Sequence, residues 1–287
     1  MNTNKSLLGI VLLLAVTLFW STTFSFAKEV LEFITPMEYV GVRFVLAALP
    51  LCVLAFFKGF KLNSVVPGVV LGITFYMGMW LQSWGIQYTT ASNAAFVTGL
   101  NVIIVCVVEA IIYHRKPSYL LSFSIIVAVI GLYFMSSVEL LSIGKGDFLV
   151  LLSAFFWGAQ VLLVDRFSKN YDNNSIVLLQ ISVAGIIGLF CAFFETRLET
   201  LAANIYIVLP YLLYLAFVCS TLALSLQIIG QRYTSPTLAA LIFLLEPVFA
   251  LIFSRIILQE TLSSQQMIGA GLLLLSTVIA TIDKIRK

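Results

Sequence analysis

Apolar stretches of about 20 residues, separated by short polar segments, recur ten times along this chain of 287 residues. A helix of that length is long enough to cross the hydrocarbon core of a bilayer, which is about 30 Å thick. The stretches lie near residues 6–27, 36–57, 66–87, 91–113, 119–138, 147–165, 175–194, 207–229, 235–258 and 264–282. The gaps between them are too short for a soluble domain. The pattern predicts an all-α polytopic membrane protein with ten transmembrane helices.

Residues typical of helix starts mark three of these boundaries. Thr35-Pro36-Met37-Glu38 fits a capping box with proline at the first helical position. Ser235-Pro236 begins the ninth stretch in the same way, and Ser263 with Gln266 fits a capping box for the tenth. The first stretch follows Lys5, as in a signal peptide, but it has no small-residue cleavage site. We therefore expect it to be retained as the first helix.

The composition agrees with a chain whose solvent is lipid. Hydrophobic residues make up 61% of the sequence and charged residues only 10%, whereas soluble domains carry about 25% charged residues. The net charge of +3 and the absence of a basic patch give no indication of nucleic-acid binding. The four cysteines stand singly in apolar stretches, without the spacing of a metal site or a disulfide framework. We expect no metal and no cofactor.

The two halves of the chain read as copies of one unit. Gly9 and Trp20 correspond to Gly146 and Trp157 at an offset of 137 residues. Later, residues 88–95 (YTTASNAA) correspond to residues 233–240 (YTSPTLAA) at an offset of 145. The pattern predicts two five-helix repeats, residues 1–140 and 141–287. Because five is odd, the second repeat would be inserted upside down, and such inverted repeats place a substrate site between them at the bilayer midplane.

Positive charge predicts the orientation. The loops between ten helices alternate between the two sides of the membrane. Of the 16 Lys and Arg residues, Arg43 lies within a helix, and four fall in the loops on the side opposite the chain ends, namely Lys28, Lys145, Arg197 and Arg255. The other 11 fall at the two ends of the chain or in the loops on their side. Since cytoplasmic loops are enriched in Lys and Arg, we expect both termini in the cytoplasm and the protein in the bacterial inner membrane.

Several segments resemble the drug/metabolite transporter superfamily, in its ten-helix EamA-type branch. They are Phe19-Trp20-Ser21-Thr22-Thr23-Phe24 through Lys28, Pro36 through Arg43-Phe44, Leu244-Leu245-Glu246-Pro247-Val248-Phe249-Ala250, Leu258-Gln259-Glu260-Thr261-Leu262 and Ile268-Gly269-Ala270. The resemblance covers nearly the whole chain. It implies a transporter with a central cavity lined by helices 1, 3, 4, 6, 8 and 9, and it does not specify the substrate.

The first repeat departs from the family pattern. Val102 stands where a proline is usual in the fourth helix, in the position that Pro247 occupies in the ninth. Asn101 corresponds to Glu246, and His114-Arg115 replaces the Leu-Gly-Glu ending that the family resemblance implies. We therefore expect a regular fourth helix with less of a kink.

Ionisable residues inside membrane helices are costly and need a partner or a polar cavity. Glu246 precedes Pro247, which leaves a backbone carbonyl unpaired, so this carboxyl is suited to binding a proton or a cationic substrate group. It could instead hold helices together through a hydrogen bond. Glu109 is expected to form a structural ion pair with Arg43, although Arg43 could alternatively meet a substrate carboxylate. Pro247 is the candidate gating residue.

Polar and aromatic residues recur at helical spacing on several stretches, and in lipid such faces generally turn inward. The candidate substrate-binding residues are Trp20, Ser21, Tyr76, Trp80, Thr98, Asn101, Trp157, Gln160, Tyr214, Thr221 and Glu246. The alternatives are contacts between helices for Ser and Thr, and a headgroup belt for Trp. An aromatic cavity with few charges suits a flat or amphipathic solute, which aromatic rings and cation–π contacts can hold.

The favoured function is a secondary-active or facilitative exporter of amino acids, aromatic or apolar ones first, or of related small metabolites. It would work by alternating access around the midplane cavity and act as a monomer in the lipid bilayer. An importer of a nucleoside, cofactor or cationic metabolite is the alternative, and a membrane sensor or assembly protein is an alternative of another class. The sequence has no Walker motif and no catalytic motif, so we expect neither direct ATP use nor an enzyme. Proton coupling through Glu246 and uncoupled transport both stay open.

Overall fold

The computed structural model describes residues 3–113, 118–135, 144–196, 198–259, 261 and 263–285. Within these ranges every regular element is a helix. In the first half they are α1 (Thr3–Val30), α2 (Pro36–Lys58), η1 (Leu62–Ser64), α3 (Val65–Ile86), α4 (Ala91–Gly99), α5 (Asn101–Tyr113) and α6 (Tyr119–Met135). In the second half they are α7 (Lys145–Ser168), α8 (Asn173–Thr196), α9 (Glu199–Ala216), η2 (Phe217–Leu222), α10 (Ala223–Gln231), α11 (Pro236–Phe243), α12 (Leu245–Ile257) and α13 (Ser264–Ile285).

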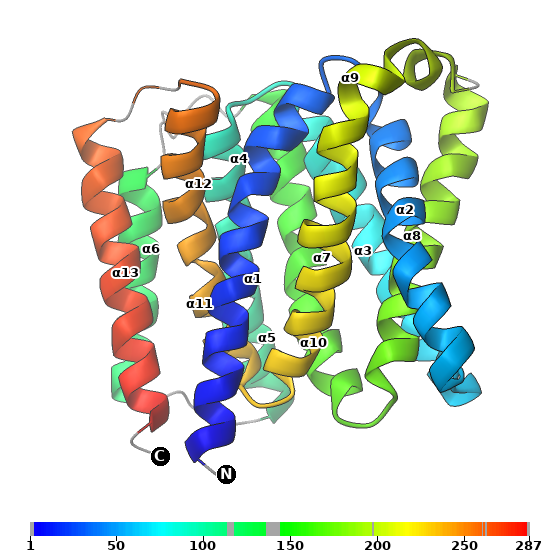
Figure 1. Cartoon of the computed structure of the whole chain (residues 1–287). Helices are drawn as coiled ribbons and strands as arrows, with labels where there is room; N and C mark the ends of the chain where they lie inside the picture. The colour runs from blue at the N-terminus through cyan, green and yellow to red at the C-terminus, as the bar shows by residue number, and fades with distance from the viewer. Residues whose placement is uncertain are drawn as a thin grey trace.

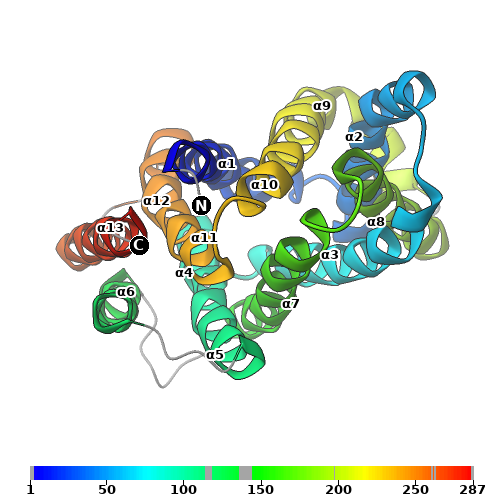
Figure 2. The same cartoon turned by 90° about the horizontal axis from the view of Figure 1, so that it is seen from below.

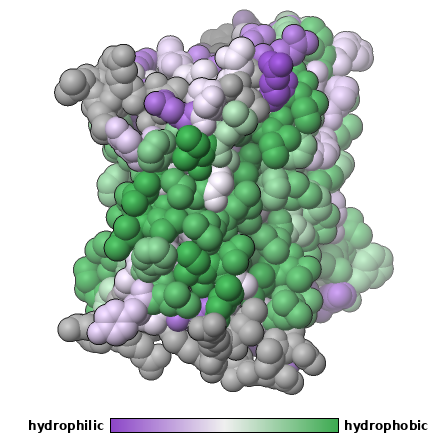
Figure 3. All heavy atoms as spheres, turned by 90° about the vertical axis from the view of Figure 1, so that its left-hand side faces the viewer, coloured by the Kyte–Doolittle hydropathy of each residue, from purple (hydrophilic) through white to green (hydrophobic). Residues whose placement is uncertain are grey.

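These helices identify a multi-pass membrane protein. In the described ranges, nine helical spans are long and apolar enough to cross a bilayer, and α6 is a shorter apolar helix of 17 residues. The predicted end of the fifth helix at residue 138 and the basic segment His114-Arg115 lie outside the described residues. Figure 3 shows a broad hydrophobic band across the middle of one face, with polar residues gathered toward the two ends. Such an apolar exterior suits contact with lipid chains rather than water.

The predicted helix starts are confirmed. The Thr35 side chain accepts a hydrogen bond from the backbone N–H of Glu38, whose carboxylate accepts one from the Thr35 N–H, which completes the capping box. The Ser235 side chain caps α11 ahead of Pro236. Ser263 and Gln266 exchange the same pair of bonds at the start of α13. Each cap satisfies backbone donors that a helix start leaves without partners.

The eighth apolar helix was predicted to begin near residue 207, but α9 begins at Glu199. The Glu38 carboxylate of α2 accepts hydrogen bonds from the Leu201 N–H, at 3.2 Å, and from the Thr200 hydroxyl. This cap comes from a residue more than 160 positions away, so local sequence gives no sign of it. The same stretch continues through α9, a π-helical turn at η2 and α10 to Gln231.

The expectation of a regular fourth helix is wrong. The chain breaks at Leu100, between α4 and α5, just as it breaks at Leu244 between α11 and α12. The two breaks face each other, because a Cβ added at Gly99 would lie 3.1 Å from Leu244 Cδ2. Proline is therefore not required for the first break. The chain tightens there, where the Leu100 N–H bonds to the Val97 carbonyl, and such tight turns interrupt the regular ladder.

Figure 2, which looks along the helix axes, shows most helices arranged in a ring, with α6 and α13 paired at one side. The start of α1 and the end of α13 lie at the same end of the molecule (Figure 1). Four pairs of glycines bring helices into close contact, and two of them are Gly9 with Gly230 and Gly85 with Gly146. A Cβ at Gly9 would lie 2.9 Å from the Gly230 carbonyl oxygen, and one at Gly146 would lie 2.7 Å from the Gly85 carbonyl oxygen. Such approaches are typical of small residues at membrane helix interfaces.

Candidate functional site

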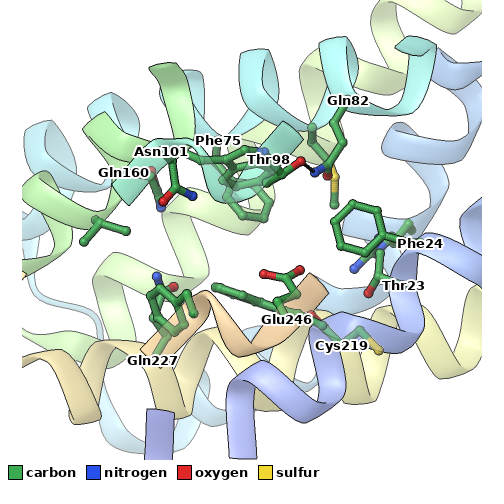
Figure 4. A pocket seen from close by; sticks show the side chains of 16 residues that line it. Thr23, Phe24, Phe75, Gln82, Thr98, Asn101, Gln160, Cys219, Gln227 and Glu246 are labelled. Carbon is green, nitrogen blue, oxygen red and sulfur yellow. Dashed lines mark hydrogen bonds between the residues drawn. The ribbon is translucent and has the colours of Figure 1, made fainter. Parts of the chain in front are cut away.

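A central cavity lies where the broken helices meet α1, α3, α7 and α10 (Figure 4). Its apolar wall is mostly aromatic and consists of Trp20, Phe24, Phe75, Met79, Trp157, Val161, Cys219 and Phe243. Its polar lining consists of Thr23, Arg43, Gln82, Thr98, Asn101, Gln160, Gln227 and Glu246. The space open to the centre of a water molecule is about 50 Å³. Ligand pockets for small organic molecules typically measure about 300–1,000 Å³, so this cavity is tight.

The two helix breaks position Asn101 and Glu246 in the cavity. Asn101 is the first residue of α5, directly after the break at Leu100, and Glu246 is the second residue of α12, directly after the break at Leu244. Both therefore stand in the first turn of a half-helix, where backbone N–H groups lack the usual partner four residues earlier in their own helix and the helix dipole is positive. Discontinuous helices of this kind form substrate sites in many secondary transporters. Pro247, which follows Glu246, is buried at the same crossing.

Several polar groups in the cavity have no partner among the described residues. Neither a hydrogen bond nor an ion pair with a described residue reaches Glu246, whose carboxylate points into the cavity in Figure 4. The Trp157 indole N–H, both amide atoms of Gln160 and the Thr23 hydroxyl are buried and also lack partners. Unpaired buried polar groups cost free energy and are uncommon in proteins. The cavity therefore offers one carboxylate, several donors and an amide oxygen to a polar ligand.

Arg43 lines the same cavity, and two of its guanidinium nitrogens donate hydrogen bonds to neighbouring hydroxyls. Its side chain is 1% exposed, and Nε donates to the Ser220 hydroxyl at 2.9 Å. A second guanidinium nitrogen donates to the Tyr39 hydroxyl, and the group lies 5.1 Å from the ring centre of Phe44. Ser220 belongs to the π-helical turn η2 and in turn donates to the Leu215 carbonyl. The guanidinium is thus fixed by its own neighbours.

The expected ion pair between Arg43 and Glu109 does not form. Glu109 instead accepts a hydrogen bond from the Thr237 backbone N–H at 2.7 Å and another from the Thr237 hydroxyl, at the start of α11. The physical reason is the demand for acceptors at a helix start, where two donors of one residue meet the carboxylate together. Glu109 is therefore a cap placed from α5 onto α11, away from the central cavity.

The other predicted site residues divide into two groups. The cavity brings together Trp20, Thr98, Asn101, Trp157, Gln160 and Glu246. Trp20 is held by a hydrogen bond from its Nε1 to the Cys219 carbonyl at 3.0 Å, and Thr98 accepts one from Gln82 at 2.9 Å.

The second group does not line the cavity. The Ser21 hydroxyl donates to the Leu18 carbonyl, the Tyr214 hydroxyl bonds Thr22, and the Thr221 hydroxyl donates to the Ala47 carbonyl. The bonds of Tyr214 and Thr221 join neighbouring helices, which was the alternative interpretation for such polar side chains, whereas Ser21 bonds a carbonyl of its own helix, α1. Tyr76 and Trp80 also lie outside the central cavity.

The structure places a different face of α3 on the central cavity from the one that the sequence predicted. The residues of α3 that line the cavity are Phe75, Met79 and Gln82, whereas the conspicuous aromatic stripe runs through Tyr76, Trp80 and Trp84. At 3.6 residues per turn, these two faces are separated by about 100–140° around the helix. The sequence signal for the face on the central cavity was the amide of Gln82 within an apolar stretch. Gln227, in the eighth stretch, was missed although it carries the same signal.

Comparison with known proteins identifies the family. The model of the EamA-like transporter family matches residues 7–137 and again residues 144–282. The chain belongs to the EamA-like transporter family. An uncharacterized transporter of Archaeoglobus fulgidus is 32% identical over 93% of this chain and 83% of its own length. The uncharacterized transporter YyaM of Bacillus subtilis is 26% identical over 94% of this chain and 92% of its own.

A protein of known crystal structure has the same fold. It is 15% identical and covers 100% of both chains, with a TM-score of 0.73. At this identity the likeness concerns the fold alone. Family membership and the transporter relatives support a membrane transporter of small solutes.

Proposed function

We propose that this EamA-type chain is a secondary-active or facilitative transporter that exports amino acids, with aromatic or apolar ones favoured, or related amphipathic metabolites. The substrate would occupy the central cavity and reach the two sides of the membrane in turn. The observation that carries this proposal is the combination of an unpaired carboxylate at Glu246 with unpaired donors at Trp157 and Gln160 inside an aromatic wall.

These groups complement the chemistry of an amino acid. The ammonium group of the substrate would bind the Glu246 carboxylate. The carboxylate of the substrate would accept hydrogen bonds from Trp157 and Gln160. Hydrogen bonds to charged groups contribute about 1.5–3 kcal/mol each, enough to hold such a substrate in place. An apolar or aromatic side chain would pack on Phe24 and Phe75, where aromatic pairs add about 0.5–1.5 kcal/mol beyond area burial.

We further propose ten membrane crossings in two inverted five-helix repeats, residues 1–140 and 141–287. The equivalent helix breaks at Leu100 and Leu244 support this arrangement. The glycine contacts support it as well. Gly9 contacts Gly230, and Gly146 contacts Gly85. The repeat offset of 137 relates Gly9 to Gly146, and the offset of 145 relates Gly85 to Gly230, so the two contacts are equivalent under the repeat. The double match of the family model is in keeping with two repeats.

The tight cavity implies that the helices must move for transport. A volume of about 50 Å³ does not admit an amino acid, so substrate entry needs the walls to separate. The crossing of the two breaks, at Gly99, Leu244 and Pro247, is where two short half-helices can tilt with the least loss of backbone hydrogen bonds. Alternating access would come from rocking of the two repeats around this crossing.

Glu246 gives two possible modes of energy use. If it releases a proton when the substrate binds, transport is coupled to a proton gradient, and if it keeps its charge, transport is uncoupled. A transport rate that ignores an imposed pH gradient would remove proton coupling. The Glu246 carboxylate pairs with no Lys or Arg in the part of the chain that the structure describes, which also favours the second candidate, an importer of a cationic metabolite. Nucleosides, cofactors and a sensor or assembly role without flux are further outcomes of the same tests.

The charge distribution supports a proposal for the orientation of the chain in the membrane. We propose that both termini are cytoplasmic, that the membrane is the bacterial inner membrane, and that one chain suffices, because both repeats lie in it.

The test of the proposed function compares metabolites in the medium of cells that overproduce the wild type with those of cells producing Glu246→Gln/Trp157→Ala. Glu199→Gln serves as the control, because this exposed carboxyl does not line the cavity. An amino acid enriched outside with the wild type and the control, but not with the double variant, supports export. Depletion of a solute from the medium would show import instead. Equal media, with the variants folded in the membrane, would favour the sensor or assembly role.

A further inference from the structure

A second cavity lies near the end of the molecule opposite the chain termini, beside the loop between α1 and α2 (Figure 1). Its lining includes Glu32, Met37, Trp80, Trp84, Tyr88 and Glu195. The space open to the centre of a water molecule is about 480 Å³, compared with about 50 Å³ in the central cavity. This volume falls in the range of about 300–1,000 Å³ that is usual for ligand pockets.

The two cavities use different faces of α3. Phe75, Met79 and Gln82 face the central cavity, whereas Trp80 and Trp84 line the second one. No residue lines both. A ligand in the second cavity would therefore contact none of the residues to which the proposed transport site is assigned.

Aromatic rings form a continuous ladder toward the second cavity. The rings of Tyr76 and Trp80 are 6.3 Å apart and inclined by only 4°, and those of Trp80 and Trp84 are 5.7 Å apart and inclined by 20°. Trp80 and Trp84 are half-buried and line the cavity. Parallel rings at such spacing present a π-face onto which another flat ring can stack.

A cation already lies against this aromatic wall. The Lys145 ammonium is 5.1 Å from the ring centre of Trp84 and 4.3 Å from that of Tyr88. Both distances are within the range of about 6 Å in which a ring face attracts a cation. Lys145 is not itself a lining residue. Its position shows that these rings are accessible to an ammonium group from the adjacent side.

The charged residues of the lining are both acidic. Glu32 and Glu195 come from the α1–α2 loop and from the end of α8, and both side chains are exposed. Neither carboxylate forms a hydrogen bond or ion pair with another described residue. Carboxylates combined with an aromatic wall select for organic ammonium ions, because the rings contribute cation–π attraction and the carboxylates contribute charge.

We propose that the second cavity is a separate binding site for a small organic ammonium ion that carries a flat ring. The ring would stack on Trp80, and the ammonium would lie toward Glu32 and Glu195. Lys145 competes with the ligand for the faces of Trp84 and Tyr88. This proposal is independent of the substrate assigned to the central cavity.

The test measures equilibrium binding to the purified full chain in lipid nanodiscs by calorimetry. Every protein carries Glu246→Gln, so that the carboxyl of the central cavity cannot contribute. The probe is tryptamine, which has an indole ring and an ammonium, and the matched neutral probe is tryptophol, in which a hydroxyl replaces the amine. The variants are Trp80→Leu, Glu32→Gln/Glu195→Gln, Lys145→Gln and Glu199→Gln, the last as a control for general negative charge at this end.

We expect saturable binding of tryptamine and at least tenfold weaker binding of tryptophol. Trp80→Leu and Glu32→Gln/Glu195→Gln should each weaken tryptamine binding about tenfold, Glu199→Gln should leave it unchanged, and Lys145→Gln should tighten it several-fold. Three results would each overturn the site: no saturable binding, equal binding of the two probes, or unchanged affinity in the Trp80 and double-carboxylate variants. A loss with Glu199→Gln as large as that of the double variant would show nonspecific attraction. Thermal unfolding curves check that each variant is folded.

Discussion

At the scale of single residues, charge inside the membrane serves separate tasks. Arg43 donates hydrogen bonds to Tyr39 and Ser220, Glu109 caps α11, and Glu246 alone of the three faces the cavity without a described partner. The sequence placed all three in membrane helices and could not tell these tasks apart. The difference depends on which helix start or hydroxyl lies opposite, and this is a property of tertiary packing.

Arg43 is expected to act on stability. Arg43→Gln leaves the Ser220 and Tyr39 hydroxyls without their donor, which should lower the free energy of unfolding by about 1–3 kcal/mol. Arg43→Lys should rescue little, because an ammonium cannot reproduce the fork of a guanidinium. The measurement is thermal unfolding in detergent, with Arg255→Gln as a comparison near a helix end. If Arg43→Gln unfolds like the wild type but binds substrate poorly, Arg43 is a substrate ligand after all.

At the scale of elements, the apolar periodicity predicted the helices well because span length follows bilayer thickness. It failed where a distant residue decides the outcome. The start of α9 depends on Glu38, and the rotation of α3, which brings Gln82 rather than Trp80 into the central cavity, depends on packing against α7 and α8. The break at Leu100 was missed because Val102, unlike Pro247, gives no local sign of it.

The break at Leu100 predicts tolerance to proline nearby. Val102 is the second residue of α5, where backbone N–H groups have no partner within their own helix, so Val102→Pro should change the stability by less than about 1 kcal/mol. Val107→Pro, in the middle of α5, should cost about 3 kcal/mol or more. Unfolding temperatures of the two variants provide the comparison. Equal losses would mean that α4 and α5 form one continuous helix in solution.

The glycine contacts give a second test of the element packing. An alanine Cβ at Gly146 would lie 2.7 Å from the Gly85 carbonyl oxygen, so α3 and α7 must separate, at a cost of about 1–3 kcal/mol. Gly271 has no atom within 4 Å of its added Cβ, so Gly271→Ala is the matched control and should be neutral or slightly stabilising. Thermal unfolding that ranks the two variants the other way would contradict the close approach of α3 and α7.

At the scale of the whole molecule, the proposed orientation makes a simple prediction. In a cysteine-free background, Ser263→Cys should react with a membrane-impermeant maleimide in spheroplasts, whereas Asn170→Cys should react only after the membrane is opened. Ser263 lies in the α12–α13 loop and Asn170 in the α7–α8 loop, and these loops lie at opposite ends of the molecule (Figure 1). The chain termini lie at the same end as the α7–α8 loop. The reverse labelling pattern would place the termini outside.

The central claim is that transport uses the unpaired carboxylate and donors of the central cavity. The most direct measurement is counterflow of radiolabelled phenylalanine or tryptophan into proteoliposomes preloaded with the unlabelled amino acid. Wild type and Glu199→Gln should accumulate label. In Glu246→Gln and Trp157→Ala the counterflow rate should fall about tenfold or more, because each variant loses one charged or aromatic contact with the substrate. Counterflow by Trp157→Ala and Glu246→Gln at the wild-type rate would contradict the assignment of this cavity as the transport site.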